Sequence, residues 1–156
     1  MMNMSGSNQI SAPREAVWTA LFDPQVLKEC IQGCEALEQV SDSEYTATVT
    51  IKIGPVKARF QGKVSIADAI VGEQCRLVGE GSGGIAGFAK GSALVKLRDA
   101  AEGTVIDYEV ESQIGGKLAQ LGARMINSAA VRMASDFFTR FAEVADAAST
   151  ESQQSV

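Results

Sequence analysis

Histidine is absent from this chain of 156 residues. Without an imidazole, neither a Ser-His-Asp nor a Cys-His catalytic arrangement can form, and no metal site can use a histidine ligand. Cysteine is scarce as well, with only Cys30, Cys34 and Cys75. Cys30 and Cys34 have the spacing of half a thiolate metal site, but a single further cysteine remains to complete it. We therefore expect no metal and no catalytic residues, and interpret the cysteines as reduced thiols.

Long apolar runs and an excess of positive charge are also missing. No run approaches the roughly 18 residues that a membrane-spanning helix needs. The first ten residues, MMNMSGSNQI, lack a basic segment followed by an apolar core, so we expect a cytoplasmic protein. Lysine and arginine number 14 against 19 aspartates and glutamates, a net charge of −5. That balance argues against a nucleic-acid partner, which needs clustered cations, but a small apolar patch would still allow peripheral contact with a membrane.

The strongest pattern present is an alternation of apolar and polar residues on both sides of Gly54-Pro55, in YTATVTIKIGPVKARFQGKVSI (45–66). Side chains alternate between the two faces of a strand, so this stretch predicts a hairpin that pairs Ile53 with Val56 and has one apolar face. That face also carries small residues, which leave room for something that is not protein. The small residues are Ala47, Ala58 and Gly62.

The remaining chain predicts a sheet that is covered by one long helix. A weakly apolar strand opens the chain, two short helices follow, and alternating segments continue to about Ile114. A proline-free segment from about Lys117 to Ala147 predicts a helix long enough to cross the whole sheet. We expect one α+β domain over residues 1–147, with six or seven antiparallel strands, and a disordered tail over residues 148–156.

Four segments resemble the CoxG family of carbon monoxide dehydrogenase accessory proteins, within the START/Bet v 1-like superfamily of helix-grip proteins. They are APREAVWTALFDPQVLKECIQGCE (12–35), IGPVKARFQGKV (53–64), GSGGIAGFAKGSALVKL (81–97) and GGKLAQLGARMI (115–126). The resemblance implies the helix-grip fold, in which a curved antiparallel sheet wraps around a long C-terminal helix. It also implies a non-catalytic accessory protein that works with a molybdenum hydroxylase of the carbon monoxide dehydrogenase type. Such proteins are associated with recruitment of the enzyme to the inner face of the cytoplasmic membrane, and with a quinone bound in the cavity.

The apolar face of the sheet is our candidate site for a quinone or another hydrophobic small molecule. We expect it to be lined by Val49, Ile51, Ala58, Phe60, Val64, Leu77, Phe88, Val95, Tyr108, Val110, Leu118, Leu121 and Met125. Native interiors are close-packed, so the volume missing at the small residues must be collapsed or filled. The glycine-rich segment 81–91 is either a mobile lid or a pair of bends in a twisted sheet.

Two other functions stay open at this point. An aromatase or polyketide cyclase would use the same fold to shape a reactive chain, and would need polar groups in the cavity; Tyr45, Tyr108 and Cys75 are the candidates. An assembly factor with a collapsed core would need no ligand at all.

Overall fold

The computed structural model describes the backbone of residues 2–154 and the side chains up to Ala145. Its strands are β1 (Met2–Ile10), β2 (Cys34–Ser41), β3 (Glu44–Ile53), β4 (Val56–Ile70), β5 (Gln74–Ser82), β6 (Phe88–Ala100) and β7 (Gly103–Gly115). Its helices are α1 (Arg14–Leu21), α2 (Pro24–Cys30) and α3 (Ala123–Gln154), with two short 3-10 helices, η1 (Gly84–Ala86) and η2 (Gly116–Leu121).

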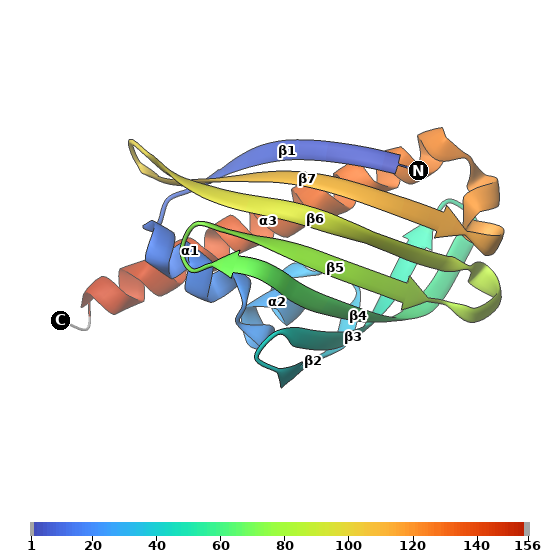
Figure 1. The fold of residues 1–156 in the computed structure, drawn as a ribbon, viewed down its shortest axis with the longest axis horizontal. Coiled ribbons are helices and arrows are strands. Elements are labelled where there is room, and N and C mark those ends of the chain that lie inside the picture. Colours follow the sequence, from blue (N-terminus) through green and yellow to red (C-terminus); the bar gives the residue numbers. More distant parts are fainter. Residues whose placement is uncertain (1, 155–156) are drawn as a thin grey trace.

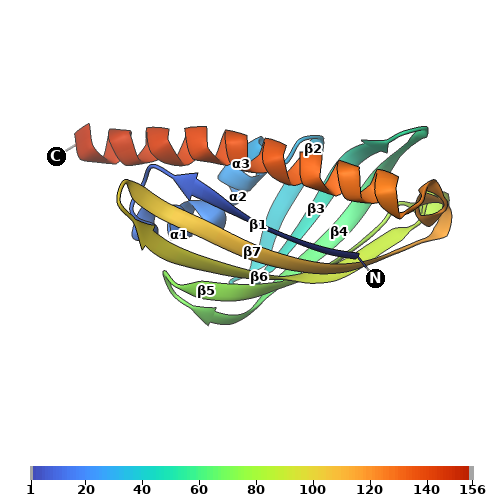
Figure 2. The same ribbon diagram turned by 90° about the horizontal axis from the view of Figure 1, so that it is seen from above.

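The seven strands form one antiparallel sheet in the order β1-β7-β6-β5-β4-β3-β2. Helix α3 crosses the inner, concave face of this sheet, and α1 and α2 fill the space beside it (Figures 1 and 2). This arrangement confirms the predicted helix-grip fold. The sheet has one face toward the helices and one toward solvent, which explains the alternation in the sequence.

The register of the central hairpin confirms the predicted pairing around Gly54. Ile53 pairs with Val56 and Val49 with Phe60 across β3 and β4. Gly54 has φ +56°, a left-handed conformation that glycine adopts without strain, so the turn can be tight enough to keep the two apolar faces together.

The C-terminal helix differs from our prediction at both ends. We expected a helix from about Lys117, but the chain first makes η2 and then turns at Gly122, which has φ +90°, so α3 begins at Ala123. A left-handed residue cannot continue a right-handed helix, and the helical spacing of the apolar residues does not reveal that interruption. At the other end α3 runs to Gln154, into the segment 148–156 that we expected to be disordered; residues 155–156 lie outside the described part.

Two apolar clusters lie at opposite ends of the space between sheet and helix. The first, which we call the packed core, joins α1, α2 and residues 137–145 of α3 to the sheet; its buried members are Ile10, Ala12, Val17, Ala20, Cys30, Leu97, Ile106, Phe141 and Ala145. The second, the end cluster, closes the other end and comprises Ile53, Phe60, Ala86, Leu118 and Ala129. We call the space between the concave face of the sheet and helix α3 the grip, and its middle lies between these two clusters.

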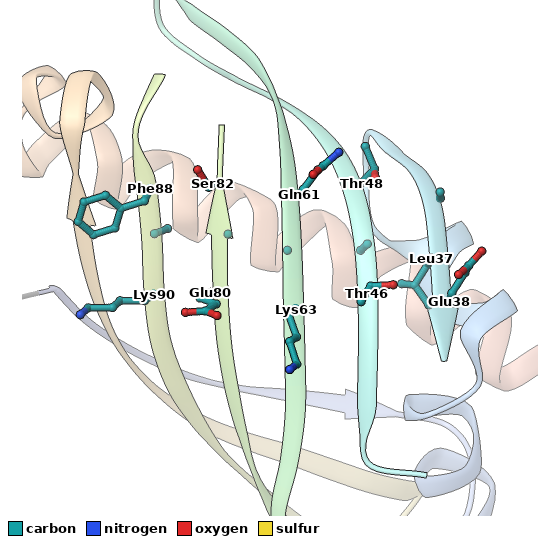
Figure 3. A pocket seen from close by; sticks show the side chains of 15 residues that line it. Leu37, Glu38, Thr46, Thr48, Gln61, Lys63, Glu80, Ser82, Phe88 and Lys90 are labelled. Atoms are coloured by element: carbon teal, nitrogen blue, oxygen red, sulfur yellow. The ribbon is translucent and has the colours of Figure 1, made fainter. Parts of the chain in front are cut away.

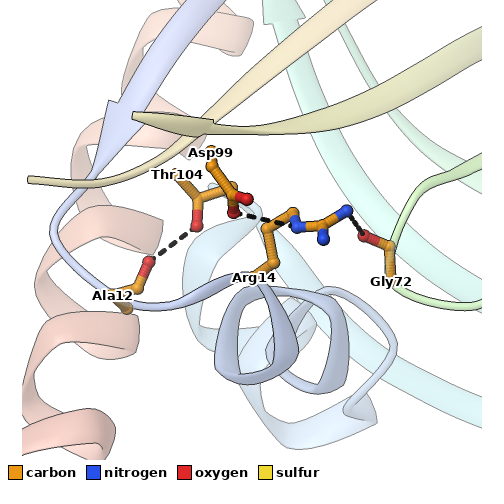
Figure 4. A network of polar contacts seen from close by, with 5 residues as sticks. All are labelled: Ala12, Arg14, Gly72, Asp99 and Thr104. Carbon is orange, nitrogen blue, oxygen red and sulfur yellow. Dashed lines mark hydrogen bonds and ion pairs between the residues drawn. The ribbon is translucent and has the colours of Figure 1, made fainter. Parts of the chain in front are cut away.

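Polar contacts fix the end of the molecule that holds the packed core (Figure 4). The guanidinium of Arg14 lies 2.9 Å from a carboxylate oxygen of Asp99 and donates to the carbonyl of Gly72 at 3.3 Å. The buried Thr104 hydroxyl donates to the carbonyl of Ala12 at 2.7 Å. These contacts tie the start of α1 to the β4–β5 and β6–β7 turns, and so orient the helices that wall the middle of the grip.

Candidate ligand-binding site

A cavity of about 570 Å³ lies between the concave face of the sheet and the helices. Binding sites for small molecules usually measure about 300–1,000 Å³, so this volume is in the range of a ligand site. The wall is contributed by β1, β2, β3, β4, β5, β6, β7, η2 and all three α-helices. It is formed by Met2, Leu21, Phe22, Leu27, Ile31, Leu37, Tyr45, Ala47, Val49, Ile51, Ile53, Phe60, Gly62, Lys63, Val64, Ile66, Leu77, Glu80, Gly81, Ala89, Ile114, Leu118, Ile126, Ala130, Met133 and Phe137.

The cavity exists because one row of the sheet has almost no side-chain volume. Ala47 pairs with Gly62, Gly62 with Gly81, and Gly81 with Ala89, so four small residues lie side by side across β3, β4, β5 and β6. Neighbouring strands are about 4.8 Å apart, so this floor is about 14 Å wide. All four residues line the cavity.

Among the residues that the structure describes, Tyr45 supplies the one hydroxyl of the cavity wall. Its side chain is buried, with 5% of its surface exposed, and its hydroxyl donates to the carbonyl of Phe22 at 2.7 Å. Burial, and to a lesser extent the nearby Asp23 carboxylate, raise the pKa of Tyr45 above its ordinary value, so the hydroxyl keeps its proton. Lys63 and Glu80 also border the cavity, but both side chains lie on the outer face of the sheet (Figure 3).

The polar groups that a cyclase would need are not gathered in this wall. Cys75 is buried where β5 pairs with β6, outside the lining, and burial raises the pKa of its thiol to about 11, so it is not a thiolate at neutral pH. Tyr108 is also outside the lining, with its ring stacked on Phe138 at 5.2 Å between centroids. Only Tyr45 of the three candidates reaches the cavity.

Six of the thirteen residues predicted for the site line the cavity: Val49, Ile51, Phe60, Val64, Leu77 and Leu118. Six others lie on the inner side of the sheet or on η2 and α3, but outside the wall. Val110 borders an adjoining hollow of about 360 Å³ that shares Val64 and Leu77. Ala58 and Leu121 pack against the end cluster, and Val95 packs against the packed core. Tyr108 stacks on Phe138, and Met125 lies over Gly54, where an added Cβ would be 2.7 Å from the Met125 sulfur.

Phe88 lies on the opposite face of the sheet from the one we expected. It pairs with Ser82, whose side chain points outward, and its ring lies over Gly115. Phe88 therefore lines an open groove of about 740 Å³ on the outer face, among threonine, serine, glutamine and charged side chains (Figure 3). A cross-strand row in that groove alternates in charge, with Glu80 paired to both Lys63 and Lys90. We interpret this larger groove as a solvated polar face and the smaller, apolar cavity as the candidate site.

Several wall residues were missing from the prediction. One group comes from the helices after β1, namely Leu21, Phe22, Leu27 and Ile31, and a second from α3, namely Ile126, Ala130, Met133 and Phe137. The spacing of three or four residues in the second group predicts one apolar helix face, which is the signal that could have placed them here. The first group carries no such signal, because helical spacing does not tell a cavity wall from a packed core.

The β3–β4 turn, η1 and η2 lie at the end of the molecule away from the C-terminal end of α3 (Figure 1). On or next to these segments is an exposed set of apolar and cationic side chains. We call it the tip surface. It comprises Ile85, Phe88 and Met125, which are 91%, 46% and 42% exposed, with the cations Lys52, Lys57, Lys117 and Arg124. The segments 45–67, 81–98 and 112–135 that build this end contain no aspartate or glutamate.

No helix in the described part of the chain is long and apolar enough to cross a membrane.

Comparison with known proteins gives one family and a set of similar structures. The profile of the CoxG family, described as the G subunit of carbon monoxide dehydrogenase, matches residues 6–146. A conserved protein from Geobacillus kaustophilus is 31% identical, with a TM-score of 0.87 over 93% of this chain and 95% of that chain. No curated protein matches.

More distant structures share the fold alone. A protein from Thermus thermophilus is 17% identical, with a TM-score of 0.71 over 95% of this chain and 99% of that chain. The Zhui aromatase/cyclase from a Streptomyces species is 9% identical, with a TM-score of 0.65 over 93% of both chains.

Proposed function

Because the chain belongs to the CoxG family, we propose that it is a non-catalytic accessory protein of a molybdenum hydroxylase of the carbon monoxide dehydrogenase type. Its cavity holds a hydrophobic small molecule, with a quinone as the best candidate. The observation that carries this proposal is the cavity of about 570 Å³ with a wall that is apolar except for Tyr45. An empty apolar space of that size forgoes the dispersion contacts that a filled interior makes, so it favours a bound lipophile.

The shape of the cavity suits a molecule with a flat ring. The floor of Ala47, Gly62, Gly81 and Ala89 exposes backbone instead of side chains, and a planar ring can lie against it. The surrounding valine, leucine, isoleucine and phenylalanine side chains suit an isoprenoid tail. The described part of the wall offers no clustered titratable groups for acid–base chemistry, which supports binding without transformation.

Native mass spectrometry of the purified chain tests the proposal. We expect the chain to retain a lipophile, or to take up one equivalent of a menaquinone or ubiquinone analogue, and to release it into an organic solvent. A chain that stays free of lipophile after saturation with both analogues would instead fit an assembly factor without a ligand. Co-purification with a molybdenum hydroxylase would test the partner separately.

We further propose that the tip surface makes peripheral contact with the inner face of the cytoplasmic membrane. Apolar side chains beside cations are the pattern by which a surface inserts shallowly among anionic lipids. Among side chains up to Ala145, no acidic group lies within 4.0 Å of Lys52, Lys57, Lys117 or Arg124. Each of these cations contributes about 1 kcal/mol of attraction near an anionic leaflet, although the chain as a whole is negative.

Charge reversal at the tip surface should weaken vesicle binding. We expect Lys117→Glu combined with Arg124→Glu to reduce partition onto vesicles of anionic phospholipid by at least about tenfold, because two attractions become repulsions. The matched control reverses Lys28 and Arg76, exposed cations on α2 and β5 that are outside the tip surface. Vesicle flotation measures both variants. Equal loss in the two variants would show that net charge, and not this surface, governs the contact.

A further inference from the structure

The polar chemistry of the cavity is concentrated in one oxygen atom, the hydroxyl of Tyr45. Every other side chain in the described wall is apolar or, as for Lys63 and Glu80, points to the outer face. The backbone groups of the floor are already paired between neighbouring strands, so a polar atom of a bound ligand that needs a side-chain partner inside the cavity finds it at Tyr45. The direction of the hydrogen bonds at that hydroxyl then decides which ligands fit.

The proton of the Tyr45 hydroxyl is already used in a hydrogen bond within the protein. Tyr45 donates to the carbonyl of Phe22 at 2.7 Å, and this is the hydrogen bond that the carbonyl accepts at the end of α1. A phenolic hydroxyl has one proton to donate and lone pairs that accept. Because that proton is donated to the Phe22 carbonyl, the hydrogen-bonding capacity that the Tyr45 hydroxyl has left for a ligand is that of an acceptor.

A ligand hydroxyl can therefore hydrogen-bond to Tyr45 more favourably than a ligand carbonyl can. A ligand hydroxyl donates to the free lone pair, and the bond from Tyr45 to Phe22 stays in place. A ligand carbonyl would have to take the Tyr45 proton away from Phe22, which leaves a partly buried carbonyl oxygen without its partner. One hydrogen bond is then lost for the one that is gained, so the second arrangement brings no net advantage.

We propose that Tyr45 makes the cavity selective for a ligand that donates a hydrogen bond, which for a quinone carrier means the reduced hydroquinone over the quinone. This inference rests on the proposed function, because it concerns the molecule that the cavity holds. It makes Tyr45 a specificity-determining residue. The carrier would accept the hydroquinone that a reduction yields and hold the quinone less tightly.

A pair of redox-inert probes tests the selectivity without interference from air oxidation. The probes are a naphthol with a long alkyl tail and its methyl ether, in which a methyl group replaces the hydroxyl proton and removes the donor. We expect isothermal titration calorimetry to show that the wild-type chain binds the naphthol about three- to tenfold more tightly than the ether, the effect of one hydrogen bond. In Tyr45→Phe the ratio should fall to about one.

The matched control is Tyr108→Phe, which removes a hydroxyl that lies outside the cavity wall. This variant should keep the wild-type ratio. A ratio of about one in the wild type, or a preference for the naphthol that survives in Tyr45→Phe, would overturn the inference while leaving the cavity a ligand site. If neither probe binds the wild-type chain, the proposed function itself fails. A wild-type ratio of about one overturns the inference even if Tyr45→Phe does not fold.

Discussion

Replacing Ala47 with phenylalanine is expected to weaken the binding of a lipophile about ten- to a hundredfold while the chain stays folded. Ala47 is part of the small-residue floor of the cavity, so a ring at this position would occupy the space of the ligand. Binding then requires the ring to leave or the wall to move, a rearrangement that costs about 1–3 kcal/mol in a packed interior.

The stability of the same variant separates an open cavity from a collapsed one. If the space is free, the phenylalanine ring fills it and buries apolar surface, so the free energy of unfolding stays equal or rises. If the interior were already close-packed, the ring would overpack it and destabilise the chain by about 1–3 kcal/mol. Urea denaturation measures this difference. Thr48→Phe is the matched control, because Thr48 is the next residue on β3 and lines the outer groove instead.

The ligand titration of both variants can use the chain's own fluorescence. Trp18 is the only tryptophan, and its ring lies 4.8 Å from that of Phe22, which lines the cavity. Because quinones quench tryptophan fluorescence at short range, ligand uptake should lower the Trp18 signal. Thr48→Phe should quench with the wild-type affinity. Equal affinities of Ala47→Phe and wild type would place the ligand outside this cavity.

Replacing Phe141 with alanine is expected to lower the free energy of unfolding by about 3–5 kcal/mol. Phe141 is fully buried in the packed core, and its ring stacks on Phe137 at 5.7 Å between centroids. Removal of the ring leaves a cavity that surrounding helices and strands cannot fill. Because the free energy of unfolding of a small domain is only about 5–15 kcal/mol, this one substitution removes a large fraction of it.

Met133→Ala provides the contrast on the same helix. Met133 lines the cavity and is already partly exposed, so its truncation removes few packed contacts and should cost no more than about 1 kcal/mol. Urea denaturation followed by circular dichroism compares the two variants. Similar losses would mean that the middle of the grip is packed as tightly as the core, contrary to our description.

The sequence predicts the fold well where the period of a pattern is unbroken. Alternation on both sides of Gly54 predicts the hairpin and its register, because a strand has a side-chain period of two. The start of α3 was not predictable in the same way. The apolar spacing continues through η2, and only the left-handed φ of Gly122 shows that the chain turns before the helix begins.

The alternation predicts which strand side chains face the helices, both before and after η1. Val49, Phe60 and Leu77 line the cavity as their alternation predicts. Phe88 lies on the outer face because β6 is one continuous strand and Phe88 comes seven residues before Val95, whose side chain packs inside. The alternation that places Val95 inside therefore places Phe88 outside, and the assignment of Phe88 to the cavity did not follow that pattern.

Titration of the wild-type chain with a menaquinone or ubiquinone analogue, monitored by Trp18 fluorescence, decides whether the cavity between sheet and helices binds a ligand. We predict saturable quenching with one site per chain, lost in Ala47→Phe and retained in Thr48→Phe. Linear, unsaturable quenching that is the same in all three proteins would contradict the assignment of the cavity as a ligand site.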